Sequence, residues 1–138
     1  MVQYLRAVHI RFQSSYKKYA AFFLLAMLSA CGNQVENIPS QNWEGIDVHV
    51  ETRPSPPRTG MNEFLIMTTS KRGQPVYDFI VSIRTSDQDP WVQAIEDGQM
   101  GVYRRAAEVA PGIRSVVQVQ IKRNGEESVL RFPLKVGE

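Results

Sequence analysis

The pattern of apolar residues after residue 45 has a period of two, and this pattern most constrains the fold. Apolar and polar residues alternate strictly from Ile46 to Glu51. A β-strand places successive side chains on opposite faces, so strict alternation is typical of a strand with one buried face. Six further segments are rich in β-branched and aromatic residues, namely 62–69, 76–84, 91–96, 102–109, 115–122 and 128–136. We therefore expect about seven strands.

The segments between these strands are rich in turn-forming residues. Asn124-Gly125 stands between two alternating segments, and both residues readily adopt the positive φ that a type I′ hairpin requires. Pro133 lacks an amide hydrogen, so the last strand should lie at a sheet edge or contain a bulge. Since no window after the first 30 residues has helical periodicity, the expected fold is all-β, a small antiparallel β-sandwich.

Alternation also predicts which side chains face the core of this sandwich. The predicted inward set is Ile46, Val48, Val50, Tyr77, Phe79, Val81, Ile83, Tyr103, Val117, Val119, Ile121, Leu130, Phe132, Leu134 and Val136. The stretch Asp97-Gly98 followed by Gly101-Val102-Tyr103 resembles the tyrosine corner of Greek-key sandwiches. That resemblance implies that the phenol of Tyr103 bonds to nearby backbone.

The first 30 residues have the composition of an export signal. Arg6, Arg11, Lys17 and Lys18 precede an apolar segment, and no acidic residue occurs before Cys31. The apolar segment 19–30 has 12 residues, fewer than the roughly 20 that a membrane-spanning helix needs. We therefore expect a processing signal at residues 1–30.

The residues at the end of this segment resemble the lipobox of bacterial lipoproteins. Leu28-Ser29-Ala30 precede Cys31, the single cysteine of the chain. The resemblance implies that the thiol of Cys31 is diacylated and that a signal peptidase cuts between Ala30 and Cys31. Each buried methylene contributes about 0.8 kcal/mol, so two or three acyl chains give stable attachment. An ordinary secretory signal with an incidental cysteine is the alternative.

The following segment is polar and predicts a flexible tether over residues 31–44, with the sandwich at 45–138. Gly32 stands where an Asp in lipoproteins often signals retention in the inner membrane. The resemblance therefore implies a periplasm-facing lipoprotein of the cell envelope, in the outer rather than the inner membrane. The lipid bilayer is its first expected partner.

The glycines and prolines of the predicted turns resemble those of the FixH/YtkA-like periplasmic domains over roughly residues 46–136. The matching stretches are Gly60 before Asn62-Glu63-Phe64, Gly73-Gln74-Pro75-Val76, Asp97-Gly98 with Gly101-Val102-Tyr103, and Pro111-Gly112. This resemblance implies an immunoglobulin-like sandwich. Some members of that family are linked to copper handling or to the assembly of cytochrome oxidase.

The composition excludes several classes of function. The part after Cys31 has 12 basic and 14 acidic residues, a net charge of −2, which argues against a nucleic-acid partner. A single cysteine excludes an internal disulfide and a multi-cysteine metal site. This part also has one histidine, no nucleophile-elbow motif and no phosphate-loop pattern. We therefore expect a protein that is not an enzyme and has no catalytic residues.

The candidate metal ligand is His49, with Asp47 and Glu51 on the same face of its strand. Met61, Met67 and Met100 carry soft thioether groups that suit copper(I). Because the strands alternate in direction, these methionines should lie at different distances from the tether end of the sandwich, too far apart to form one metal site. We therefore expect no cofactor beyond the covalent lipid, and copper handling is the alternative function.

Seven alternating strands place three loops at the end of the sandwich away from the tether. These loops are 53–58, 87–91 and 111–114, and they combine rigid proline-containing backbone with aromatic and cationic side chains. The expected function is a non-enzymatic accessory module that contacts another envelope protein through these membrane-distal loops. The candidate contact residues are Trp91, Arg58, Arg53 and Arg114.

Overall fold

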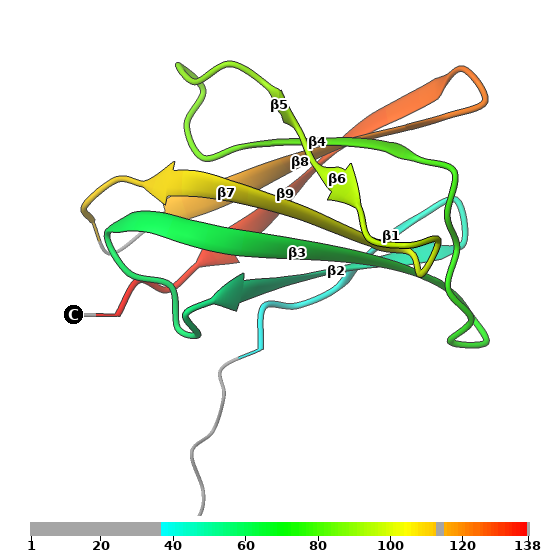
Figure 1. The fold of residues 1–138 in the computed structure, drawn as a ribbon, viewed down its shortest axis with the longest axis horizontal. Helices are drawn as coiled ribbons and strands as arrows, with labels where there is room; N and C mark the ends of the chain where they lie inside the picture. Colours follow the sequence, from blue (N-terminus) through cyan, green and yellow to red (C-terminus); the bar gives the residue numbers. More distant parts are fainter. Residues whose placement is uncertain (1–36, 113–114, 138) are drawn as a thin grey trace, which may run out of the picture. The chain divides into compact units, whose positions relative to one another are not determined.

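The computed structural model describes residues 37–112 and 115–137, and these residues form two antiparallel β-sheets (Figure 1). They all belong to one compact unit that begins at Val35. The two-sheet, all-β architecture confirms the prediction from alternation. The expected signal and lipobox (residues 1–31) lie outside the described residues. Within the described residues, no helix is long and apolar enough to cross a membrane.

The first sheet has five strands in the order β1-β2-β3-β7-β6. Their bounds are β1 Gln41–Trp43, β2 Ile46–Arg53, β3 Gly60–Ser70, β7 Val102–Val109 and β6 Ile95–Glu96. The long central strand β3 pairs with β2 on one side and with β7 on the other. The sheet is therefore widest at its centre and ends in two short edge strands.

The second sheet has four strands in the order β5-β4-β8-β9. Their bounds are β5 Val92–Gln93, β4 Ile80–Arg84, β8 Ser115–Arg123 and β9 Glu126–Leu134. Among the described residues, no strand pairs with the outer side of β9, which confirms the prediction that Pro133 belongs to an edge strand. The expected strand at 91–96 is two strands, because Ala94 marks the point at which the chain passes from one sheet to the other.

The core lies between the two sheets and contains most of the predicted inward set. Val48, Val50, Phe79, Val81, Ile83, Tyr103, Val117, Val119, Ile121, Leu130, Phe132 and Leu134 are buried, and Ile46 and Val136 pack against them. Sequence alternation missed Phe64 and Ile66, which are fully buried in β3. Their segment carries Leu65 between them, and Leu65 is also buried, so three consecutive apolar residues conceal the period.

Tyr77 contradicts the predicted inward set, since 42% of its surface is exposed. Strand β4 begins at Ile80 rather than at residue 76. The preceding Asp78 has a φ of 70°, a left-handed conformation that interrupts a regular strand. Phe79 after this break points into the core, while Tyr77 before it points outward.

Two tight hairpins set the register at one end of each sheet. Asn124 and Gly125 have φ values of 53° and 88°, as predicted for a type I′ turn between β8 and β9. Glu44 and Gly45 have φ values of 49° and 82° and form the same kind of turn between β1 and β2. Strand β1 thus lies in the segment expected to be tether, and the sheet begins at Gln41.

Tyr103 is fully buried, and its phenol oxygen accepts a hydrogen bond of 3.1 Å from the backbone N–H of Phe79. This contact joins β7 of the first sheet to the segment that enters β4 of the second. The partner lies 24 residues away in sequence, so it is not the nearby backbone that the tyrosine-corner pattern implies. Burial raises the pKa of Tyr103, and the neighbouring carboxylates of Glu96 and Asp78 act in the same direction.

Candidate functional site

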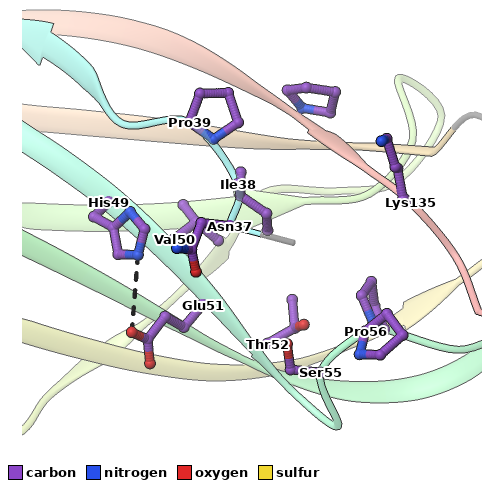
Figure 2. Close-up of a pocket in the computed structure, with 12 residues that line it drawn as sticks. Asn37, Ile38, Pro39, His49, Val50, Glu51, Thr52, Ser55, Pro56 and Lys135 are labelled. Carbon is purple, nitrogen blue, oxygen red and sulfur yellow. Dashed lines mark ion pairs between the residues drawn. The ribbon is translucent and has the colours of Figure 1, made fainter. Parts of the chain in front are cut away.

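A groove of about 360 Å³ opens on one side of the sandwich, between β2 and the end of β9 (Figure 2). We call it the β2–β9 groove. Its lining residues are 37–39, 49–52, 55–57, Pro133 and Lys135. This volume lies at the lower end of the range for ligand pockets. The groove is the candidate functional site.

The groove exists because β1 covers only part of β2. Strand β1 pairs with residues 46–48, whereas β2 continues to Arg53. Extending the same antiparallel register would place Pro39 opposite Val50. A proline has no amide hydrogen to donate to that ladder, so the pairing stops. Pro39 is visible in the sequence within the predicted tether, 31–44.

The uncovered part of β2 presents backbone groups to the groove. A two-residue hairpin closes on a hydrogen-bonded pair, here Trp43 and Ile46, and such pairs recur at every second residue. The amide and carbonyl groups of Val50 and Thr52 therefore point to the same edge as those of Ile46. The side chains of Val50 and Thr52 are buried. A strand edge without a neighbour is a ready site for another extended chain.

Two contacts close the ends of the β2–β9 groove. At one end the side-chain amide of Gln41 donates a hydrogen bond to the backbone carbonyl of Arg131 in β9. At the other end the backbone N–H of Gly137 donates to the carbonyl of Pro57 at 2.7 Å. Arg58 and Gly137 form an isolated parallel bridge beside that contact. The sandwich is thus joined on both sides of the opening.

The rim of the groove carries polar and charged side chains above apolar walls. Nε2 of His49 lies 3.8 Å from Oε1 of Glu51, and the two side chains are 32% and 54% exposed (Figure 2). Lys135 lines the opposite wall, and Pro56 and Pro57 contribute rigid apolar surface. Main-chain hydrogen-bonding groups, apolar walls and a polar rim are suited to binding a short extended polypeptide.

The described residues of the predicted contact loops lie at one end of the sandwich, as expected from strand alternation (Figure 1). Thr85 after β4 donates a hydrogen bond of 2.6 Å to the carbonyl of Glu108 near the end of β7. The described part of the expected tether, residues 37–40, begins at this same end of the sandwich. Asn37, Ile38 and Pro39 lie beside the residues of the loop after β2. The unpredicted strand β1 reverses the direction in which the chain enters.

The three candidate contact residues that the structure describes, Arg58, Arg53 and Trp91, have different surroundings. Arg58 is exposed in the loop beside the β2–β9 groove, whereas Arg53 is exposed and lies 3.8 Å from Glu63 on the outer face of the first sheet. Trp91 is half-buried, with the guanidinium of Arg84 at 4.5 Å from its ring centroid. Arg114, together with Cys31 and the lipobox residues 28–30, lies outside the described residues.

Trp91 belongs to a polar network on the outer face of the second sheet. Arg84 contacts both Asp87 and Gln118 at 3.0 Å. The side-chain amide of Gln118, itself buried, donates to Asp87 at 2.6 Å. This hydrogen bond holds the pKa of Asp87 below its ordinary value, and the guanidinium groups of Arg131 and Arg84 add to that effect, against opposing desolvation. No sequence signal pointed to this network.

The candidate metal-ligating side chains also lie apart from one another, with one exception. Within residues 37–112 and 115–137, no three His, Cys, Asp or Glu side chains gather as a metal site would require. Met61 lies opposite Glu108, six residues along β3 from Met67, and Met100 lies in the turn before β7. Met67, however, lies directly opposite His49 in the pairing of β2 with β3. Sequence spacing alone did not reveal this pair.

Comparison with known proteins finds no matching family model, no matching curated protein and no matching solved structure. The all-β two-sheet architecture stands on the structure alone, and the resemblance to FixH/YtkA-like domains stays a prediction.

Proposed function

We propose that this chain is a lipid-anchored envelope lipoprotein whose immunoglobulin-like sandwich binds an extended segment of another envelope protein in the β2–β9 groove. The lipobox at Leu28–Cys31 supports the anchor, and the sheet that begins at Gln41 follows it closely. The proposed role is non-enzymatic, with the covalent lipid as the only attached group. The observation that carries the binding role is the uncovered edge of β2 beside an open groove.

The position of the groove refines the expected geometry at the membrane. Asn37, which lines the groove, lies six residues after Cys31. Six residues span at most about 20 Å when fully extended. An anchored Cys31 would therefore keep the groove within about 20 Å of the lipid surface, in contrast to the membrane-distal contact first expected. The proposed partner is an envelope protein with an extended segment close to the membrane.

Site-specific photo-crosslinking in cells tests this binding role. A photoreactive residue at Ser55, or at Lys135 on the opposite wall, should capture the same protein, whereas one at the exposed Gln93 of β5 should not. Thr52→Pro removes the backbone N–H that faces the groove and should lower the yield several-fold. Thr52→Val keeps that N–H and serves as the matched control.

Thermal unfolding of both Thr52 variants shows whether the domain remains folded. Equal capture from Gln93 and Ser55 would contradict the assignment of the groove. Capture that is unchanged in a folded Thr52→Pro variant would contradict strand pairing.

Copper handling is a second candidate function, and the pairing of His49 with Met67 favours it. Residues directly opposite in an antiparallel pair have their Cβ atoms about 5 Å apart. An imidazole and a thioether at that separation are suitable ligands for copper(I). Titration of the fragment from Val35 onward with copper(I) should then show binding that His49→Ala and Met67→Leu each abolish. Met61→Leu is the control, and affinity weaker than about micromolar rules this function out.

A further inference from the structure

The outer edge of β9 presents a self-complementary surface. We propose that two copies of this chain associate by antiparallel pairing of β9 with β9 about a two-fold axis at Val129. This inference does not depend on the proposed binding role, because the pairing uses residues 126–132 of β9, whereas the groove is lined by Pro133 and Lys135 beyond them. Its basis is the direction of the backbone groups of β9 together with the order of its exposed side chains.

The hairpin between β8 and β9 fixes which backbone groups face outward. Arg123 and Glu126 flank its two-residue turn and are directly paired, so they form the first hydrogen-bonded pair. Residues at even positions of β9 therefore bond to β8, and those at odd positions present their backbone groups to the free edge. The hydrogen bond that Gln41 donates to the carbonyl of Arg131 agrees with this alternation. The free edge thus presents the backbone groups of Glu127, Val129 and Arg131, and the carbonyl of Arg131 already accepts one hydrogen bond there.

The side chains at these three positions carry opposite charges on the two sides of an uncharged central residue. Val129 is 42% exposed, with Glu127 two residues before it and Arg131 two residues after it. Antiparallel pairing about Val129 places Glu127 of each copy opposite Arg131 of the other. Each dimer gains two pairs of opposite charge, and such cross-strand pairs stabilise a sheet. The exposed valines would face each other at the axis.

Both ends of the proposed pairing coincide with natural ends of the strand. The same register places Gly125 of the turn opposite Pro133 of the other copy. Pro133 has no amide to donate, so the ladder ends there. Glu126 to Phe132 would pair, and the carbonyl of Arg131 has a second lone pair to accept a new hydrogen bond beside that from Gln41. A seven-residue ladder is a small interface, so we expect a weak dimer.

The fragment from Val35 to Glu138 tests this inference because it contains all the strands that the structure describes and no cysteine. A Val129→Cys variant should form a disulfide-linked dimer under mild oxidation, since a hydrogen-bonded antiparallel pair separates Cα atoms by about 5.5 Å. In analytical ultracentrifugation, Glu127→Arg and Arg131→Glu should each raise the dimer Kd about tenfold. The double variant Glu127→Arg/Arg131→Glu should restore dimerisation.

A matched control is Glu126→Arg, which makes the same change of charge one residue away, opposite the uncharged Phe132 of the other copy. It should leave the Kd unchanged. Thermal unfolding of each variant separates loss of pairing from loss of folding, because Glu127 also contacts Lys122 within the chain at 3.0 Å. A fragment that remains monomeric at about 1 mM, or a dimer whose Kd is unaffected by Glu127→Arg, overturns the inference.

Discussion

Gly101→Ala is expected to destabilise the sandwich by about 3 kcal/mol or more, a larger effect than the same change at the other described glycines. Gly101 is buried and has a φ of 65°. A Cβ at this position would lie 2.7 Å from the carbonyl oxygen of Thr68 and 2.8 Å from that of Val76. Both are backbone atoms, so neither moves without disturbing the sheet.

The contacts around Gly101 explain why this disturbance would spread. Its carbonyl accepts a hydrogen bond of 2.8 Å from the backbone N–H of Thr68 in β3. Thr68 in turn accepts from the N–H of Val76 at 2.9 Å. The turn before β7, the end of β3 and the segment leading to β4 therefore meet at this glycine. Moving any one of them strains the other two.

Gly98→Ala is the matched control for this prediction. Gly98 has nearly the same φ, 63°, and a Cβ there meets nothing within 4 Å. Gly98→Ala should lower the free energy of unfolding only by the cost of placing alanine in a left-handed conformation, about 1–2 kcal/mol. Thermal or urea unfolding of the two variants measures the difference, and the melting temperature of Gly101→Ala should fall by about 15 °C. Equal losses in the two variants would show that close packing at Gly101 is unimportant.

The sequence was informative where local chemistry determines the structure. Alternation from Ile46 and the Asn124-Gly125 turn each specify a strand face or a turn type within a few residues. The Glu44-Gly45 turn was not expected, because glutamate is an unusual residue at positive φ and because β1, the strand before the turn, has only three residues, two of them polar. That one short strand changed where the chain enters the sandwich.

Much less of the candidate site could be predicted from the sequence. The β2–β9 groove depends on the difference in length between β1 and β2 and on contacts that join the two sheets. Gln118 is buried on the outer face by its hydrogen bond to Asp87, although its position in an alternating strand predicts exposure. His49 and Met67 are 18 residues apart and meet only through the register of β2 with β3. Such features arise from tertiary pairing.

The second large effect is expected at Cys31. Cys31→Ser should convert a membrane-bound protein into one that carries no lipid, because the hydroxyl of serine does not replace the thiol that the lipobox family acylates. Two acyl chains hold a protein at a bilayer firmly, since each buried methylene contributes about 0.8 kcal/mol. The loss of covalent lipid should therefore be nearly complete. Asn33→Ser, two residues away, introduces the same residue type and should have no effect.

The most direct measurement of the central claim is metabolic labelling with an alkyne-bearing fatty acid in bacterial cells, followed by detection of the label on this chain. Lipid anchoring at Cys31 predicts a strong label on the wild-type protein and on Asn33→Ser, both in the membrane fraction, and none on Cys31→Ser. An unlabelled wild-type protein, or a label that persists in Cys31→Ser, would contradict it.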